Sequence, residues 1–133
     1  MLERKFTSYL TKFLTEERNK ILLVNGARQI GKSYLIRYVG RKLFSHFVEI
    51  NLKEDVEGDK VFADVRTTDD LYMRLSNYCP TPLGDNTDTL VFLDEIQSYP
   101  HLMTMLKFLN QESRYRFIAS GSQLGVALAQ TPS

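Results

Sequence analysis

The spacing of hydrophobic residues along this chain changes several times between two periods. Near the N-terminus apolar side chains recur every three or four residues, which predicts an amphipathic helix over residues 3–18. Short apolar or alternating runs predict strands near residues 20–25, 46–52, 89–94 and 115–120. Helical spacing returns between these strands. The alternation of strands and helices predicts an α/β fold, with a parallel sheet between two layers of helices.

Local signals give the bounds of the intervening segments. A helix is expected from the end of residues 26–33 to about Leu43, and residues 53–66, which are charged and contain Gly58, are expected to form a surface loop. Thr67 or Thr68 should open the next helix, which ends before Pro80. The expected buried face of that helix consists of Leu71, Leu75 and Tyr78. Pro100 should open a last helix, with a solvated His101 and with a buried face of Leu102, Met105, Leu106 and Leu109.

The segment after the first predicted strand carries a phosphate-binding pattern. Residues 26–33 read Gly-Ala-Arg-Gln-Ile-Gly-Lys-Ser, a complete Walker A motif G-x-x-x-x-G-K-[ST] between a strand and a helix. Its glycines let successive N–H groups face phosphate oxygens, and the helix that follows adds its positive N-terminal dipole. We expect Lys32 to bind the β- and γ-phosphates and the Ser33 hydroxyl to ligate Mg²⁺. The predicted nucleotide-binding residues are Gly26, Ala27, Arg28, Gln29, Ile30, Gly31, Lys32, Ser33 and Tyr34.

Two carboxylates end the predicted strand near residues 89–94. Apolar residues 90–93 precede Asp94 and Glu95, so residues 90–95 form a Walker B arrangement. A strand buried on both faces brings these side chains out at the carboxyl edge of the sheet, where α/β sheets bind ligands. We expect Asp94 to hold Mg²⁺, directly or through water. Glu95 should orient and polarise the attacking water as a catalytic residue.

A third polar segment, residues 120–123, ends the last predicted strand. In many P-loop ATPases the strand in this place lies between the Walker B strand and the loop strand. A polar side chain at its end can then touch the γ-phosphate or the attacking water. Ser120, Ser122 and Gln123 are therefore candidates for a sensor, and an ordinary turn containing Gly121 is the alternative.

Composition adds few constraints. The 133 residues allow one domain, residues 1–133, and 17 Lys plus Arg face 16 Asp plus Glu, so no global charge favours nucleic acid or a membrane surface. The apolar runs are too short to span a bilayer, and the charged start lacks an apolar signal core. The single Cys79 fits a reducing compartment. We therefore expect a cytoplasmic protein without membrane partners.

The chain resembles the prokaryotic AAA-like ATPases in which the ATPase core is followed by a C-terminal domain of unknown function, itself reported to look like a restriction-nuclease fold. The resemblance covers most of the chain and rests on residues 26–33, on 92–97 (Phe-Leu-Asp-Glu-Ile-Gln) and on 118–122 (Ile-Ala-Ser-Gly-Ser). The Arg-Gln pair inside the loop and the Ile-Gln after the acidic pair are more particular than the Walker motifs alone. The resemblance implies a P-loop NTPase fold of the ASCE, AAA-like class, with ATP as the nucleotide.

The same resemblance implies parts that lie outside residues 1–133. These are a further core strand, an arginine finger or second sensor, and the C-terminal domain. We therefore expect an N-terminal fragment that is truncated before the last core strand. In the sheet order of this class the missing strand would pair with residues 21–24, so we expect an apolar edge, self-association, weak ATP binding and hydrolysis barely above background.

Two functions of other classes stay open beside an ATPase. A small-molecule kinase uses the same loop, although the basic residues near it, Arg37, Arg41 and Lys42, lie along or just after the loop helix rather than in a separate lid. A GTPase is disfavoured, because the sequence has no N-K-x-D segment to read guanine.

The second alternative is a nucleotide-gated module that binds DNA or protein and hydrolyses little ATP. Its basic patch could consist of Lys107, Arg114 and Arg116, although at this nearly neutral net charge the sequence favours an ordinary solvated face for them. Our primary hypothesis is Mg²⁺-dependent ATP binding and hydrolysis in a cellular process that the resemblance does not assign.

Overall fold

The computed structural model describes residues 2–26 and 31–122. In chain order the elements are α1 (Leu2–Glu16), β1 (Leu22–Asn25), α2 (Lys32–Leu43), β2 (His46–Asn51), α3 (Leu52–Glu57), α4 (Thr68–Tyr78), β3 (Thr89–Asp94), the 3₁₀ turn η1 (Ile96–Ser98), α5 (Pro100–Glu112) and β4 (Arg116–Gly121). The four strands lie where the hydrophobic pattern predicts them, within about two residues at each end. None of the described helices combines the length and apolar character that crossing a membrane requires.

The strands form one parallel sheet in the order β1-β4-β3-β2. Every residue of β3 and β4 is buried, because these strands are central and helices cover both of their faces. β4 lies between β1 and β3, so the expected place of the strand after the acidic pair is confirmed. Since all strands run the same way, Asn25, Asp94 and Gly121 end at one edge of the sheet.

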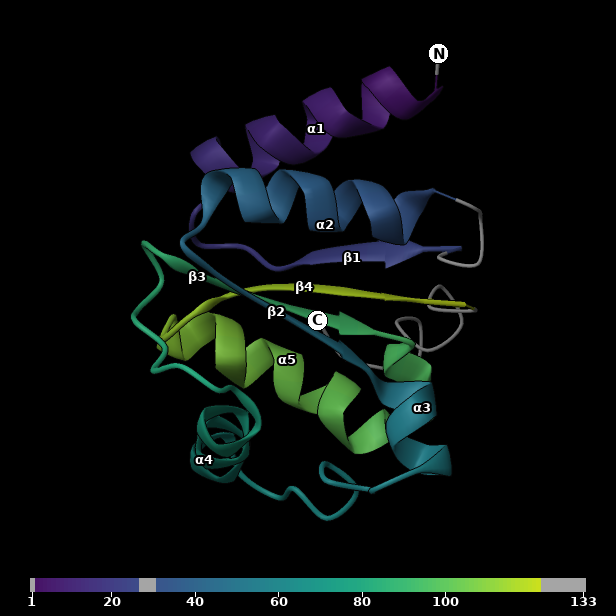
Figure 1. Ribbon diagram of the computed structural model, residues 1–133, viewed down its shortest axis with the longest axis vertical. Helices are drawn as coiled ribbons and strands as arrows, with labels where there is room; N and C mark the ends of the chain where they lie inside the picture. The colour runs from purple at the N-terminus through teal and green to yellow at the C-terminus, as the bar shows by residue number, and fades with distance from the viewer. Residues whose placement is uncertain (1, 27–30, 123–133) are drawn as a thin grey trace.

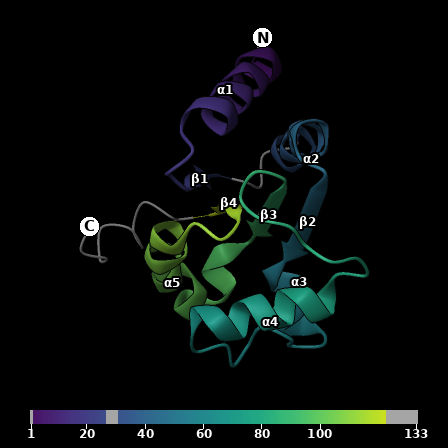
Figure 2. The same cartoon turned by 90° about the vertical axis from the view of Figure 1, so that its left-hand side faces the viewer.

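Helices cover the two faces of the sheet and confirm the predicted α/β architecture (Figures 1 and 2). On one face α1 and α2 pack over β1, β3 and β4 through a core that includes Leu10, Ile36 and Phe92. On the other face α3, α4 and α5 pack around a larger core. α2 approaches β2 closely at Gly40, where a Cβ atom would lie 2.6 Å from the Phe47 ring.

The outer edge of β1 has no strand beside it within the described residues. Leu22 and Val24 nevertheless point into the core, and Leu23 is half-buried on the other face of the sheet. The apolar edge expected from the sequence is therefore present in this part of the chain. Self-association through it stays a prediction.

Residues with known N-terminal preferences explain where α4 and α5 begin. The Thr67 side chain accepts a hydrogen bond from the Asp70 N–H at 3.1 Å, and Pro100 occupies the first turn of α5. All four residues expected on the buried face of α5 are buried: Leu102, Met105, Leu106 and Leu109. Tyr78, expected on the buried face of α4, is instead 50% exposed. Tyr72 takes the buried place and donates to Glu112 Oε1 at 2.5 Å.

The expected surface loop over residues 53–66 is correct only in part: residues 58–66 form no helix or strand and most side chains of the segment are exposed, but its first part is helical and two of its side chains are buried. Residues 52–57 form α3, which Asn51 caps by accepting from the Glu54 N–H at 3.0 Å, and Phe62 is fully buried. The cause is the inward-turned Asp55 carboxylate, which accepts from the N–H groups of Val61 and Phe62, each at 3.0 Å. The segment can therefore pack into the core without leaving its backbone unpaired. His101, expected to be solvated, is half-buried, with Nε2 3.1 Å from the Phe62 carbonyl oxygen.

Candidate functional site

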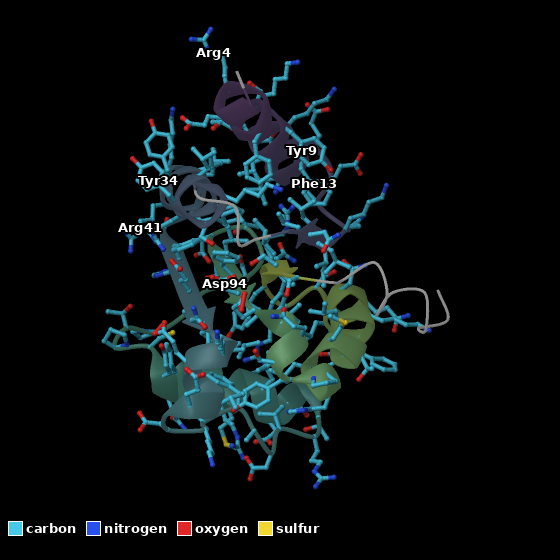
Figure 3. The ribbon with its side chains drawn as sticks, turned by 90° about the vertical axis from the view of Figure 1, so that its right-hand side faces the viewer. Arg4, Tyr9, Phe13, Tyr34, Arg41 and Asp94 are labelled. Carbon is cyan, nitrogen blue, oxygen red and sulfur yellow. The ribbon has the colours of Figure 1, made fainter. Side chains whose placement is uncertain are left out.

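The carboxyl edge of the sheet brings together one polar residue from each of the three motifs, Ser33, Asp94 and Ser120. Figure 3 looks onto this edge and shows Asp94 near its centre, with α1 and α2 on one side. The Gly26 N–H donates to the Gly121 carbonyl oxygen at 2.9 Å, so the chain that leaves β1 stays attached to the end of β4. Ala27, Arg28, Gln29 and Ile30 lie outside the described residues. Their expected contacts with nucleotide stay predictions.

The glycines that flank this loop adopt backbone conformations that favour glycine. Gly26 has φ 76° and Gly31 has φ 101°, and both values are unfavourable for a residue with a Cβ atom. Gly31 is the N-cap of α2. The first turn of an α-helix leaves its N–H groups without intrahelical partners, so the start of α2 can bind an anion. The local geometry thus agrees with the phosphate-binding pattern.

Asp94 is the best-connected side chain of the site. Its Oδ1 accepts from the Ser120 hydroxyl at 2.7 Å and from the Glu95 N–H at 2.9 Å. The Ser33 hydroxyl lies 3.4 Å from Oδ2, long for a hydrogen bond between two oxygens. Ser120 is fully buried and Asp94 is 9% exposed, so this arrangement belongs to the core. One carboxylate oxygen is held firmly while the other faces the start of α2.

The donor set of Ser33 and Asp94 fits a magnesium ion. Both offer oxygen atoms, the ligands that Mg²⁺ prefers, and the ion commonly takes only one or two protein ligands beside substrate phosphates. The described residues contain no group of three or more His, Cys, Asp or Glu side chains that could hold a metal by themselves. Magnesium sites of this type are completed by water and by the phosphates of a substrate.

Glu95 follows Asp94 but has a different environment. Its backbone is left-handed, with φ 58° and ψ 47°, a conformation that costs a non-glycine residue about 1–3 kcal/mol. The half-buried side chain accepts at Oε2 from Gln97 Nε2 at 3.3 Å. Strained residues of this kind persist where the surroundings hold them, often at functional sites.

Lys32 projects back over the end of β1. Its Nζ donates to the Asn25 carbonyl oxygen at 3.3 Å and lies 5.8 Å from the centre of the Phe6 ring. The salt bridges of the described residues do not include Lys32. Its ammonium group is therefore only weakly engaged and can move to a phosphate.

The sensor candidates separate in the structure. Ser120 is bonded to Asp94, whereas the half-buried Ser122 contributes its N–H, which donates to Gln97 Oε1 at 3.3 Å. Gln123 lies outside the described residues. Tyr34, expected beside the nucleotide, is 62% exposed on α2. Their roles toward a nucleotide stay predictions.

Two further polar contacts near the site escaped the motif search. The Arg37 guanidinium on α2 donates to both Glu49 carboxylate oxygens on β2, at 2.7 and 2.8 Å. This hydrogen-bonded pair raises the pKa of Arg37, and the charge of Asp94 adds to the effect. The second contact is made by Gln97 on η1, which touches both Glu95 and Ser122. The only sequence signal for Gln97 was the Ile-Gln pair that follows the two acidic residues.

Arg116, which was a candidate for the basic patch of the alternative function, is 4% exposed. It donates to the Leu14 and Glu17 carbonyl oxygens, at 2.8 and 3.2 Å, and so closes the C-terminal end of α1. Burial lowers the pKa of this guanidinium. Arg116 therefore belongs neither to an exposed basic patch with Lys107 and Arg114 nor to a solvated face.

Comparison with known families adds one finding to this geometry. Residues 18–133 match the sequence model of a family described as AAA domain. The matched range contains the loop after β1, the acidic pair after β3 and the polar end of β4, and it begins after the end of α1. A search of curated proteins found no match.

Proposed function

Since the chain belongs to the AAA domain family, we propose that it binds ATP together with Mg²⁺ and hydrolyses it. The observation that carries the proposal is the 3.4 Å approach of the Ser33 hydroxyl to Asp94 Oδ2, between residues 61 positions apart in the chain. In P-loop NTPases the loop serine or threonine and the Walker B aspartate hold the same Mg²⁺, so the contact supports a shared role for Ser33 and Asp94. The family membership supports nucleotide binding in general, and the site geometry supports the finer assignment.

Each residue near the loop has a separate task in this proposal. The N–H groups of residues 26–33 and the Lys32 ammonium would bind the phosphates. Ser33 and Asp94 would hold Mg²⁺, which when bound neutralises charge on the β- and γ-phosphates. The hydrogen bonds that Asp94 Oδ1 accepts from Ser120 and Glu95 keep Oδ2 turned toward Ser33.

The Glu95 carboxylate would orient the attacking water and accept its proton. It follows the strand end directly, so the left-handed backbone turns it away from Asp94 and lets the two acids do different work. Ser120 acts through Asp94 in this scheme, and the Ser122 hydroxyl is the remaining candidate for a contact with the γ-phosphate. The assignment of adenine as the base rests on resemblance to the AAA-like ATPases.

The alternatives receive less support from the contacts. A kinase lid would need free arginines, and Arg37 is already paired with Glu49. A DNA-binding face made with Arg116 would require that buried side chain to leave the core. We also propose a cytoplasmic location, for which the sequence reasons stated above are the support.

Replacement of Lys32 tests the proposal directly. Lys32→Ala should weaken Mg-ATP binding by about 2–4 kcal/mol, roughly 30- to 1000-fold in Kd, because a charged hydrogen-bonded contact to phosphate is lost. Isothermal titration calorimetry on the complete gene product measures this change. Lys42→Ala, on the exposed end of the same helix, is the matched control and should bind as the parent does. Equal affinity of parent and folded Lys32→Ala would remove the central claim.

A further inference from the structure

One side chain in the site joins two strand ends. Gln97 lies on η1, directly after the acidic pair, and is half-buried. Its Nε2 donates to Glu95 Oε2 at 3.3 Å, and its Oε1 accepts from the Ser122 N–H at 3.3 Å. The first contact reaches the carboxylate that follows β3, and the second reaches the backbone that follows β4.

The chemistry of the two partners determines which way the amide faces. A backbone N–H can only donate, so the oxygen of the Gln97 amide must face Ser122. An ionised carboxylate can only accept, so the nitrogen must face Glu95. A glutamine satisfies both partners at once. Leucine would satisfy neither, and a glutamate would place a second negative charge beside Glu95.

Gly121 provides the space for this side chain. A Cβ atom at residue 121 would lie 2.1 Å from Gln97 Oε1, much closer than non-bonded atoms allow. The positive-φ glycines of the described residues are Gly26 and Gly31, so the backbone of Gly121 does not itself require glycine. The absence of a side chain at this position therefore serves the close approach of Gln97.

We propose that Gln97 is a positioning residue for Glu95. By tying the carboxylate to the end of β4, it would hold the proposed base in the orientation that addresses the attacking water. It would also make that orientation follow any movement of the β4 end, where Ser120 and Ser122 lie. This inference rests on the proposed function, because it assigns Gln97 a role only through Glu95.

Steady-state kinetics on the complete gene product test the role. Gln97→Leu should lower kcat about 10- to 100-fold, as expected when a reacting group is misplaced, and should leave the KM for ATP within about twofold. Gly121→Ala should displace the Gln97 amide and likewise lower kcat while leaving the KM for ATP nearly unchanged. The double variant should have a kcat no lower than that of either single variant, since both substitutions remove the same interaction between Gln97 and Glu95. Ser98→Ala, in the same turn, is the matched control and should keep the parent kcat.

A measurement without nucleotide tests the contact itself. At one fixed pH, the ¹⁵N-labelled Gln97 side-chain amide signal of the parent protein should change position in Glu95→Gln and in Gly121→Ala, because each substitution disturbs the contact of the amide with residue 95 or 122. The signal should stay in place in Ser98→Ala. A Gln97 signal that is the same in the parent and in Glu95→Gln would overturn the proposal, whatever the ATPase rate.

Other outcomes are equally decisive. If Gln97→Leu keeps the parent kcat, Gln97 does not position Glu95. The same conclusion follows if the losses of kcat in the two single variants add up in the double variant. If ATP binds but the parent does not hydrolyse it, the hydrolytic part of the proposed function fails, and the positioning role fails with it even where the amide contact is real. If ATP does not bind and Lys32→Ala changes nothing, the error lies in the proposed function as a whole.

Discussion

Asp94 and Asp55 are two inward-turned carboxylates that the same kinds of donor surround, yet they differ in what they leave available. Asp55 accepts from two N–H groups at 3.0 Å and from the Tyr99 hydroxyl at 2.8 Å, and these donors occupy both of its oxygens. Asp94 concentrates two short hydrogen bonds on Oδ1 and leaves Oδ2 with the 3.4 Å contact to Ser33. A saturated carboxylate stabilises a segment, whereas a half-saturated one retains capacity for a ligand.

The largest expected effect concerns the strand end that carries Asp94. Glu95→Gln should lower ATP turnover about 10²- to 10⁴-fold and keep ATP binding, because water activation is lost while the phosphate contacts remain. Asp94→Asn should instead weaken the Mg²⁺ dependence of binding. Turnover and calorimetry on the complete gene product separate the two. Parent-like turnover in Glu95→Gln would show that another group is the base.

Asp55 should behave in the opposite way. Asp55→Ala leaves three donors without their acceptor, so the free energy of unfolding should fall by about 3 kcal/mol, while a folded variant keeps its ATP affinity. Urea unfolding and calorimetry measure both quantities. Asp59→Ala, at an exposed position nearby, is the control and should change neither. A loss of ATP affinity without loss of stability would break the contrast between the two carboxylates.

A smaller effect should appear at high pH. Burial and the hydrogen bond to Asp55 raise the pKa of Tyr99 to about 12 from an ordinary value of 10.0. Because the folded-state pKa is the higher one, this contribution to stability is complete below pH 10 and is lost as the pH rises toward 12. Burial raises the pKa of Tyr72 too, so Tyr72 also contributes to the loss of stability at high pH. The contribution of Tyr99 is therefore the difference between the loss of stability in the parent and that in Tyr99→Phe.

Urea unfolding of both proteins at pH 8 and pH 11 measures that difference. The parent should lose more stability than Tyr99→Phe over this interval. An equal loss in both proteins would mean that the Tyr99 hydroxyl is not coupled to the Asp55 carboxylate in the folded state.

The motif residues were predictable from sequence because their signals are local. The loop at residues 26–33 shows its chemistry in its own spacing, and the apolar run before Asp94 predicts a buried strand that ends in acids. The apolar face of α5 was predictable for the same reason, since it follows helical spacing within one element. Residues 53–66 misled the sequence argument because a charged run is normally solvated, and nothing local shows that Asp55 turns inward.

Sequence alone thus determined the order of strands and helices, the position of the G-x-x-x-x-G-K-[ST] pattern between β1 and α2, and the acids at the end of β3, since each depends on neighbours within a few residues. Only the tertiary structure decided which oxygen of Asp94 is occupied, that Arg116 closes α1 from within the core, and that Gln97 reaches β4 beside Gly121. Those contacts join segments that are distant in the chain. Their geometry follows from the parallel register of β1, β4 and β3, which places the strand ends together and which no local spacing encodes.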